Sequence, residues 1–507
     1  MNDLSPRPQG KSDPTLPSWV FWRFLHRVFF ATVIIVVAGP MALHADEAAD
    51  DAAKGQAAFD RKDYNGAIAD FSDAIHLDPR SAGNLTGRAF AYLMKGDFDH
   101  TIADCTAAIR LDPNDDEAFD HRGYAYLEKG DYDRSIADSN EAIRINPTIP
   151  TIYNNRGSAY YRKRDYARAI ADFTDAIRLN ADYALAYFNR GAALDDKGEH
   201  DRALADYNDA IRLNPRLAPA YSNRGAAYLN AGDPDRAIAD CTEAVRLDPS
   251  LLDAYTTRSL AYDRKGNFDQ AIADSTETIR LSPKSASGYL QRVVANLEKG
   301  DFDRAISDCD EAIRLDSKSY RAYSLRGAAY DKKGDRDRAM ADYDEAVRLE
   351  PHSPIAFLIR ANAKESEGDF DGAASDYLSG LGLNAAKQAY PQFHLTLVLR
   401  RLHRDEAPAG LTKALTNWKE GWPKTVGRYL TGDLPEADFL VEAVKGDAKT
   451  VREHQCEADY YVGMTHLING DAAVARTFLT RCIDTQVTNF TEFNLAKAEL
   501  ARLQVAN

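Results

Sequence analysis

Hydrophobic, small and charged positions follow one another along most of this chain in a pattern that repeats every 34 residues. The phrase DYNGAIADF returns in related forms without a single insertion between the copies. The copies begin at Asp63, Asp97, Asp131, Asp165, Glu199, Asp233, Asn267, Asp301, Asp335 and Asp369. A fixed period of this length indicates an array of similar structural units rather than one globular core.

Each unit predicts two helices joined by a tight turn. Residues 220–249 give a clear copy, AYSNRGAAYLNAGDPDRAIADCTEAVRLDP, in which one helical stretch leads to Gly232 and another leads to Pro249. Glycine is common just past the end of a helix, and the residue before a proline avoids the helical region of backbone space. We therefore expect the first helix to end at Gly232 and the second to end before Pro249.

Small side chains mark where the two helices approach each other. We number each repeat so that the residue after the turn is place 16, which puts small residues at place 8 and at place 20. Place 8 is glycine at Gly123, Gly157, Gly191, Gly225 and Gly327, and place 20 is alanine at Ala169, Ala203, Ala237, Ala271 and Ala305. Antiparallel helices bring these places level, so the two backbones are expected to pack closely.

This pattern resembles that of the tetratricopeptide-repeat (TPR) family throughout residues 49–384. The resemblance implies an all-α fold, a TPR solenoid, in which helical hairpins form a right-handed superhelix with a concave groove lined by the first helices. One hairpin cannot bury its apolar face alone, so stacking must supply the core. We predict an export segment over residues 1–45, a ten-repeat array over residues 46–384 and a helical C-terminal region over residues 385–507.

An array of this kind offers a large inner surface that suits extended peptides or helices. We therefore expect proteins or peptides as partners, although the repeat pattern does not identify them. The formal net charge of −15 argues against nucleic acid as the main partner. Hydrophobic residues make up 44% of the chain and charged residues 28%, which is an ordinary balance for a soluble protein.

Two charged columns run through the repeats. Place 7 is arginine at Arg88, Arg122, Arg156, Arg190, Arg224, Arg258, Arg292, Arg326 and Arg360. Place 23 is aspartate at Asp70, Asp104, Asp138, Asp172, Asp206, Asp240, Asp274, Asp308, Asp342 and Asp376. The arginines could form a strip for acidic ligands, but a ladder of internal ion pairs is favoured because every repeat offers a carboxylate. Arg224 is expected to pair with Asp240 or with the corresponding aspartate of an adjoining hairpin.

The groove side is predicted from places 5, 9 and 12, which form one stripe of the first helix. Place 5 carries no Lys or Arg in any of the ten copies, so a basic clamp for a C-terminal carboxylate is not expected. The stripe is apolar around one repeat, at Leu260, Leu290, Val294 and Leu297. We predict that this patch contacts an apolar ligand segment, with ordinary packing between neighbouring hairpins as the alternative.

The five cysteines fall into two groups. Cys105, Cys241 and Cys309 share place 24, on the buried stripe of the second helix, where cysteine acts as a small apolar residue. Cys456 and Cys482 take places 1 and 27 of a later hairpin. These two places lie opposite each other on the two antiparallel helices of that hairpin. We predict a disulfide between them in an oxidising compartment, with two unrelated buried thiols as the alternative.

No motif for catalysis or metal binding stands out. The eleven histidines are scattered without the spacing of metal ligands, and no Ser/His/Asp signature is found. We therefore predict a protein that is not an enzyme and that needs no cofactor and no metal.

The N-terminal segment has the three-part plan of a secretory signal. Residues 1–27 are polar and basic overall, residues 28–43 are an apolar run, and Ala45 offers a cleavage point. We expect a mature periplasmic protein that begins near Asp46, with anchoring in the inner membrane by residues 19–43 as the alternative. No cysteine lies near the end of the apolar run, so an N-terminal lipid anchor is not expected.

The regular phrase stops near Asn384. The following region contains GWPKTVGRYLTGDL at residues 421–434, then a TPR-like hairpin at residues 456–484, and then a final helix that would cap the stack. This order resembles the C-terminal region of NlpI-type TPR proteins of the Gram-negative cell envelope. The resemblance implies a periplasmic adaptor that brings substrates to a protease and organises peptidoglycan hydrolases. The long array and the missing lipid-anchor cysteine depart from that family.

Three functions are therefore considered. The first is a periplasmic adaptor for cell-wall or proteolytic enzymes. The second is a general assembly scaffold in secretion or envelope biogenesis. The third is an enzyme whose activity lies in residues 385–507. Catalytic activity of that segment on its own would favour this third function.

Overall fold

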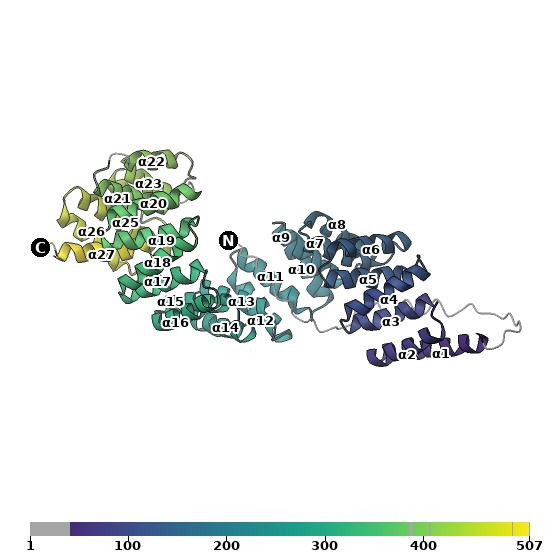
Figure 1. Cartoon of the computed structure of the whole chain (residues 1–507). Coiled ribbons are helices and arrows are strands. Elements are labelled where there is room, and N and C mark those ends of the chain that lie inside the picture. The colour runs from purple at the N-terminus through teal and green to yellow at the C-terminus, as the bar shows by residue number, and fades with distance from the viewer. Residues whose placement is uncertain (1–40, 385–388, 405–406, 489, 506–507) are drawn as a thin grey trace. The chain divides into compact units, whose positions relative to one another are not determined.

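The computed structural model describes residues 41–384, 389–404, 407–488 and 490–505 (Figure 1). All regular structure in these ranges is helical, which confirms the predicted all-α solenoid of helical hairpins. The predicted export segment lies outside the described residues, except for its last residues at the start of α1. The helices divide into two compact units between Lys265 and Gly266, and each unit is described by itself.

The first unit contains six complete hairpins and the first helix of a seventh. Its helices are α1 (Met41–Asp60), α2 (Tyr64–Leu77), α3 (Ala82–Met94), α4 (Phe98–Leu111), α5 (Asp116–Glu128), α6 (Tyr132–Ile145), α7 (Pro150–Arg162), α8 (Tyr166–Leu179), α9 (Ala184–Asp196), α10 (His200–Leu213), α11 (Ala218–Asn230), α12 (Pro234–Leu247) and α13 (Leu252–Arg264).

The second unit contains the remaining repeats and the C-terminal region. Its helices are α14 (Phe268–Leu281), α15 (Ala286–Lys299), α16 (Phe302–Leu315), α17 (Tyr320–Lys333), α18 (Arg336–Leu349), α19 (Pro354–Glu367), α20 (Phe370–Asn384), α21 (Ala389–Arg401), α22 (Ala407–Leu415), α23 (Trp422–Thr431), α24 (Glu436–Glu442), α25 (Ala448–Ile468), α26 (Ala472–Asp484) and α27 (Thr491–Val505).

The hairpin α11–α12 shows why the repeat sequence folds this way. Gly232 has a φ of 84°, a left-handed conformation that glycine adopts without steric cost. Asp233 follows at place 16, and its side chain accepts a hydrogen bond from the amide of Arg236, which caps α12. A Cβ atom on Gly225, at place 8, would lie 2.7 Å from the sulfur of Cys241, so glycine is required for this close approach.

The first helices of successive hairpins lie on the inner side of each stack. In the first unit α3 contacts α5, α5 contacts α7 and α11 contacts α13, and in the second unit α15 contacts α17. Within each unit, no two successive second helices make comparable contact in the described residues. The hairpins therefore splay on the side of the second helices, and the first helices form the inner face of each unit.

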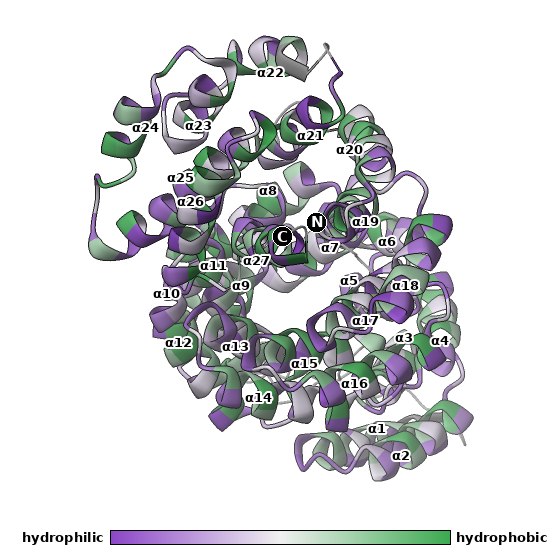
Figure 2. Ribbon diagram, turned by 90° about the vertical axis from the view of Figure 1, so that its left-hand side faces the viewer, coloured by the Kyte–Doolittle hydropathy of each residue, from purple (hydrophilic) through white to green (hydrophobic). Residues whose placement is uncertain are grey.

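Hydrophobic and hydrophilic residues follow each other within the helices (Figure 2). This pattern is typical of helices that pack on one side and meet solvent on the other. None of the described helices combines the length and the apolar character needed to cross a membrane.

The C-terminal region shares its core with the last repeat. Leu358 of α19 and Tyr377 of α20 belong to one buried cluster with Leu395 and Val398 of α21. A larger core follows, in which α21 and α23 pack against α25, α26 and α27. The predicted boundary at residues 384 and 385 is therefore a change in the repeat pattern and not a gap in packing.

Candidate functional site

The arginine and aspartate columns pair within each hairpin. Arg224 of α11 donates from Nε and Nη2 to the two carboxylate oxygens of Asp240 of α12, both at 2.7 Å. The same bidentate geometry recurs in other hairpins, at Arg88–Asp104, Arg122–Asp138, Arg156–Asp172, Arg190–Asp206, Arg292–Asp308, Arg326–Asp342 and Arg360–Asp376. The side chains of Arg224 and Asp240 are 18% and 11% exposed, so the pair is largely withdrawn from solvent.

Each of these arginines also joins its hairpin to the preceding one, which sequence reasoning missed. The Nη1 atom of Arg224 donates to Asn208 at 2.6 Å, at place 25 of the hairpin before. Place 25 supplies an acceptor to each place-7 arginine in the same way, at Ser72, Thr106, Asn140, Thr174, Asn208, Thr242, Thr276, Asp310 and Asp344. The guanidinium groups are thus occupied within the array and do not form an open strip for acidic ligands.

The residues of the predicted apolar patch differ in their exposure. Leu260 of α13 is 44% exposed and belongs to the first unit. Leu290 of α15, in the second unit, is buried against Ala312 of its own hairpin and Ala322 of the next hairpin. Leu297 packs beside Val293 in a neighbouring cluster, and Val294 is half-buried. Packing between hairpins therefore accounts for Leu290, because place 5 turns into the seam between neighbouring repeats.

The inner face of the first unit is a connected polar surface. Asn155 of α7 donates to Asp120 of α5 at 3.0 Å, and Asn189 of α9 donates to Asn154 of α7 at 2.9 Å. Tyr161 of α7 donates to Asp196 of α9 at 2.6 Å. Side chains from successive first helices are thus tied to one another, so the face is held in one arrangement.

Aromatic rings extend this face toward the start of the array. Phe90 of α3 stacks on His121 of α5 with ring centroids 4.5 Å apart, and Phe90 also stacks on Phe59 of α1 at 4.6 Å. Burial lowers the pKa of His121 and raises the pKa of the neighbouring Asp120. The face therefore combines ring surfaces with amide and carboxylate groups, which is chemistry suited to a peptide.

A second cluster of polar groups lies inside the second unit and was not predicted. The ring of His394 of α21 lies 3.4 Å from Glu365 of α19 and 3.5 Å from Glu492 of α27. Tyr377 donates to Glu365 at 2.6 Å, and Tyr461 donates to Glu492 at 2.7 Å. Burial alone lowers the pKa of His394, but the two carboxylates outweigh it and raise that pKa to about 10.

Glu457 of α25 forms the outer part of this buried cluster. Trp422 donates to one of its oxygens at 2.8 Å, and Tyr390 donates to the other at 3.2 Å. Burial, followed by the charge of Glu492, raises the pKa of Glu457 to about 8. The exposed fractions of Glu365, His394, Glu457 and Glu492 are between 2% and 4%, which leaves no access for a substrate. We interpret the cluster as a fastening between helices.

The cysteines are all buried free thiols. The sulfur atoms of Cys456 and Cys482 lie 3.5 Å apart, so they are brought together as expected from their places, but the predicted disulfide is not formed in this structure. Cys105, Cys241 and Cys309 lie on the separate helices α4, α12 and α16.

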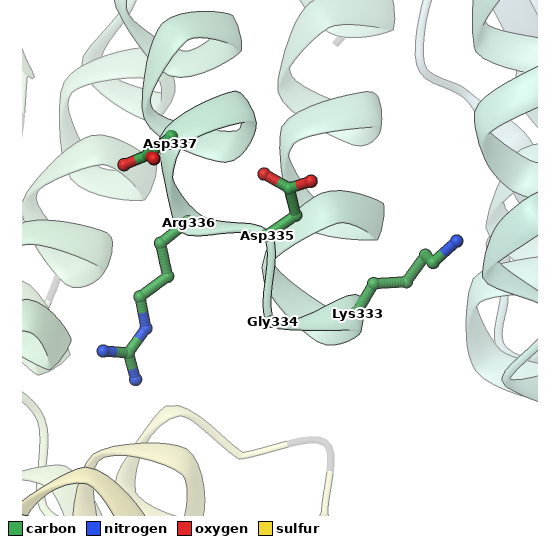
Figure 3. Close-up of a pocket in the computed structure, with 5 residues that line it drawn as sticks. All are labelled: Lys333, Gly334, Asp335, Arg336 and Asp337. Atoms are coloured by element: carbon green, nitrogen blue, oxygen red, sulfur yellow. The ribbon is translucent and has the colours of Figure 1, made fainter.

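One depression lies at the turn between α17 and α18 and is lined by the five consecutive residues 333–337 (Figure 3). Figure 3 shows Lys333 and Arg336 pointing away from each other, so their charges do not converge on one point. No group of His, Cys, Asp or Glu side chains suited to a metal ion is found in the part of the chain that the structure describes.

Comparison with known families matches repeats over more than half of the chain. A model described as "TPR repeat" matches residues 123–164. Models described as "Tetratricopeptide repeat" match the other segments, at residues 52–116, 154–218, 218–251, 256–320 and 320–353.

Solved structures with similar folds include several repeat proteins. A tetratricopeptide repeat protein from Parabacteroides merdae is 19% identical, with 49% of this chain and 98% of that chain covered and a TM-score of 0.42. A MamA structure is 30% identical over 32% of this chain and 94% of its own, with a TM-score of 0.30. The APC/C hetero-tetramer Cut9–Hcn1 is 13% identical over 91% and 97%, with a TM-score of 0.45.

Proposed function

Because this chain belongs to the tetratricopeptide-repeat family, we propose that it is a protein-interaction scaffold whose inner face in the first unit holds an extended segment of another protein. The family's fold binds proteins or peptides, and the proposal assigns that role to a particular surface of this chain. The observation that carries it is the connected polar face formed by α5, α7 and α9.

The chemistry of that face suits a peptide backbone. An Asn side chain presents one carbonyl acceptor and two amide donors. These groups can pair with the N–H and C=O groups of an extended backbone, which have no partners within the peptide itself. Asn189 is half-buried and donates to the side chain of Asn154, which is 4% exposed, at 2.9 Å. That bond fixes the position of Asn189, so a bound segment would not have to order it first.

We further propose that the protein works in the bacterial cell envelope as an exported adaptor for proteases or peptidoglycan hydrolases. The basic segment, the apolar run at residues 28–43 and Ala45 support export. The C-terminal resemblance to NlpI-type proteins supports the adaptor role. A general assembly scaffold in secretion or envelope biogenesis would use the same inner face and is the second candidate.

Site-specific photo-crosslinking tests the proposed face. A photoreactive residue at Tyr124 of α5 or at Leu260 of α13 samples first helices, and one at Arg246 of α12 samples an exposed position on a second helix. We expect a discrete crosslinked protein from the first two positions and none from the third. Equal crosslinking from all three positions would count against an inner-face ligand.

Two further measurements separate the parts of the proposal. Asn189→Ala should weaken binding of the captured protein by about tenfold, because one hydrogen bond and the order of Asn154 are lost together. Arg246→Ala is the matched surface control and should leave binding unchanged. N-terminal sequencing of the protein from cell fractions tests export: a periplasmic chain beginning near Asp46 supports it, and an intact N-terminus on a membrane-bound chain supports the anchor instead.

A further inference from the structure

Two of the five thiols lie together at the meeting point of three helices. Cys456 of α25 and Cys482 of α26 are both fully buried, and their sulfurs are 3.5 Å apart. The sulfur of Cys482 also lies 3.9 Å from the carbonyl oxygen of Glu492, in the first turn of α27. This pair therefore occupies the point where α27 packs onto the hairpin α25–α26.

The hairpin brings these two positions level in the same way as its other close contacts. A Cβ atom on Gly463 would lie 2.9 Å from the side chain of Leu479 and 3.3 Å from the carbonyl of Ala475. Gly470 forms the turn with a φ of 90°, and Asp471 caps α26. Because the helices are held this closely from the turn onward, Cys456 and Cys482 face each other with no room for another side chain between them.

We propose that Cys456 and Cys482 form a structural disulfide that fastens α25 to α26 and fixes the seat of α27. A disulfide has sulfurs about 2.05 Å apart, so these two atoms need to approach by about 1.5 Å. The proposal rests on the proposed export only for its oxidant, since thiols of exported proteins meet an oxidising environment.

The chemistry is an exchange with an external disulfide, such as that of an oxidoreductase or of oxidised glutathione. The Cys456 thiolate attacks one sulfur of the external disulfide, and the other sulfur leaves as a thiolate. Cys482 then loses its proton and attacks the Cys456 sulfur, which expels the remaining external thiolate. The two protein thiols lose two electrons, the external disulfide gains them, and the two released protons balance the two external thiols.

Burial decides when the exchange takes place. In the folded chain both sulfurs have no exposed surface, so the exchange takes place before α26 has docked onto α25. At that stage the contact between the two thiols has not yet formed, so the same balance holds with Cys456 and Cys482 exchanged.

The place of the bond explains what it would stabilise. Glu492 lies in the first turn of α27 and is the partner of His394, which in turn faces Glu365 of the last repeat. A disulfide beside the start of α27 would hold Glu492 in contact with His394, within the buried cluster of His394, Glu365 and Glu492. The other three cysteines, at place 24 of α4, α12 and α16, have no such position and serve as internal controls.

Mass spectrometry of the purified full chain, unfolded in urea and refolded in a glutathione redox buffer, tests the proposal. After unfolding and alkylation of free thiols, we expect three alkylated cysteines and a linked peptide pair containing Cys456 and Cys482, 2 Da lighter than its reduced form. Native protein should resist mild reductant, whereas urea-unfolded protein should be reduced readily. Five alkylated cysteines after oxidation, or a linkage between other pairs, would overturn the proposal.

Thermal unfolding with and without dithiothreitol separates the stability that the disulfide contributes from the stability that packing of the two cysteine side chains contributes. Oxidised parent protein should lose on the order of 5 °C in the transition of the C-terminal region when reductant is present. The double variant C456A/C482A should show no reductant effect, whatever its own stability, and C309A should retain the full effect. If reductant does not change the transition temperature of the parent protein, the proposal is also overturned. Because purified protein and glutathione are used, failure here is distinct from failure of the proposed export.

Discussion

The imidazole of His394 lies 3.4 Å from the carboxylate of Glu365, and both side chains are almost completely buried. Neither ring nitrogen of His394 has an aligned hydrogen-bond acceptor among the described residues, so the contact is mainly ionic. Glu365 belongs to the last regular repeat and His394 to the helix that follows it. The ion pair therefore fastens the C-terminal region to the end of the repeat array, and breaking it would leave a buried charge alone.

Stability of the second unit should fall as the pH rises from about 6.5 to 10. The folded pKa of His394, about 10, lies above its unfolded value of 6.5, so its stabilisation is complete below pH 6.5 and is lost toward pH 10. Glu457 has a folded pKa of about 8 against 4.5 unfolded, so its contribution is lost between those values. Each proton contributes a slope of about 1.4 kcal/mol per pH unit, measurable by urea unfolding at a series of pH values.

Substitutions assign this pH dependence to its groups. His394→Gln should remove the slope between pH 8 and 10 and about half of the slope between pH 6.5 and 8, and Glu457→Gln should remove the other half. The pKa of Glu492 is lowered by His394 against the effect of burial, so its own contribution is lost only at acid pH. His403→Gln changes an exposed residue in the turn after α21 and serves as the control. A parent protein with constant stability from pH 6.5 to 10 would contradict the assignment.

Removing one partner of the Arg224–Asp240 pair should cost more than removing both. Arg224→Leu or Asp240→Leu alone leaves a partly buried charge, and we expect a loss of about 1–4 kcal/mol, between the values for exposed and fully buried pairs. The double substitution leaves no charge unpaired and should be milder than either single change. Denaturant unfolding combined with hydrogen exchange in α11 and α12 would measure the three variants.

The exposed pair Arg246–Glu243 provides the matched control. Its side chains are 66% and 33% exposed, so Arg246→Leu should change stability by less than about 0.5 kcal/mol. If Arg224→Leu is as mild as this control, the ladder contributes little to stability.

Repetition explains which features could be predicted from the sequence. Places 7 and 23 lie eight residues on either side of the turn, so the pairing of Arg224 with Asp240 follows from hairpin geometry. The contact of Arg224 with Asn208 was missed because place 25 varies among Ser, Thr, Asn and Asp. These residue types look unrelated in a column, yet each supplies an oxygen acceptor.

Other features depend on packing that the period does not encode. Leu290 lies on the same helical stripe as exposed residues, but it is buried where its hairpin packs against the next one. The cluster of His394, Glu365 and Glu492 joins residues that are far apart in sequence and lie partly outside the regular repeats. Only the path of α21 and α27 back to α19 brings them together, and the amino-acid sequence contains no local sign of that path.

Adding one methyl group at Gly191 should destabilise the hairpin α9–α10. A Cβ atom there would lie 2.8 Å from the ring of Tyr207 and 3.3 Å from the carbonyl of Ala203, so both helices would have to shift. We expect Gly191→Ala to cost about 1–3 kcal/mol in denaturant unfolding. Gly410 of α22 has no atom within 4 Å of the corresponding position, and Gly410→Ala should be neutral or stabilising by up to about 1 kcal/mol. Equal effects at the two sites would show that close helix approach is not the reason for glycine at place 8.

One repeat should become more stable when its missing helix cap is restored. Asp233 accepts a hydrogen bond at 3.0 Å from the amide of Arg236, whereas Glu199 at the same place makes no cap and pairs with Lys197 and Arg202. The shorter aspartate side chain reaches the first-turn amides, so Glu199→Asp should stabilise α10 by about 0.5–1 kcal/mol. The exposed ion pairs of Glu199 with Lys197 and Arg202 contribute less to stability than a helix cap. Hydrogen exchange at the start of α10 measures the gain, and Asp233→Ala should show a comparable loss in α12. If Asp233→Ala lowers protection in α12 but Glu199→Asp does not raise it in α10, the backbone at the start of α10, and not the length of the Glu199 side chain, prevents capping.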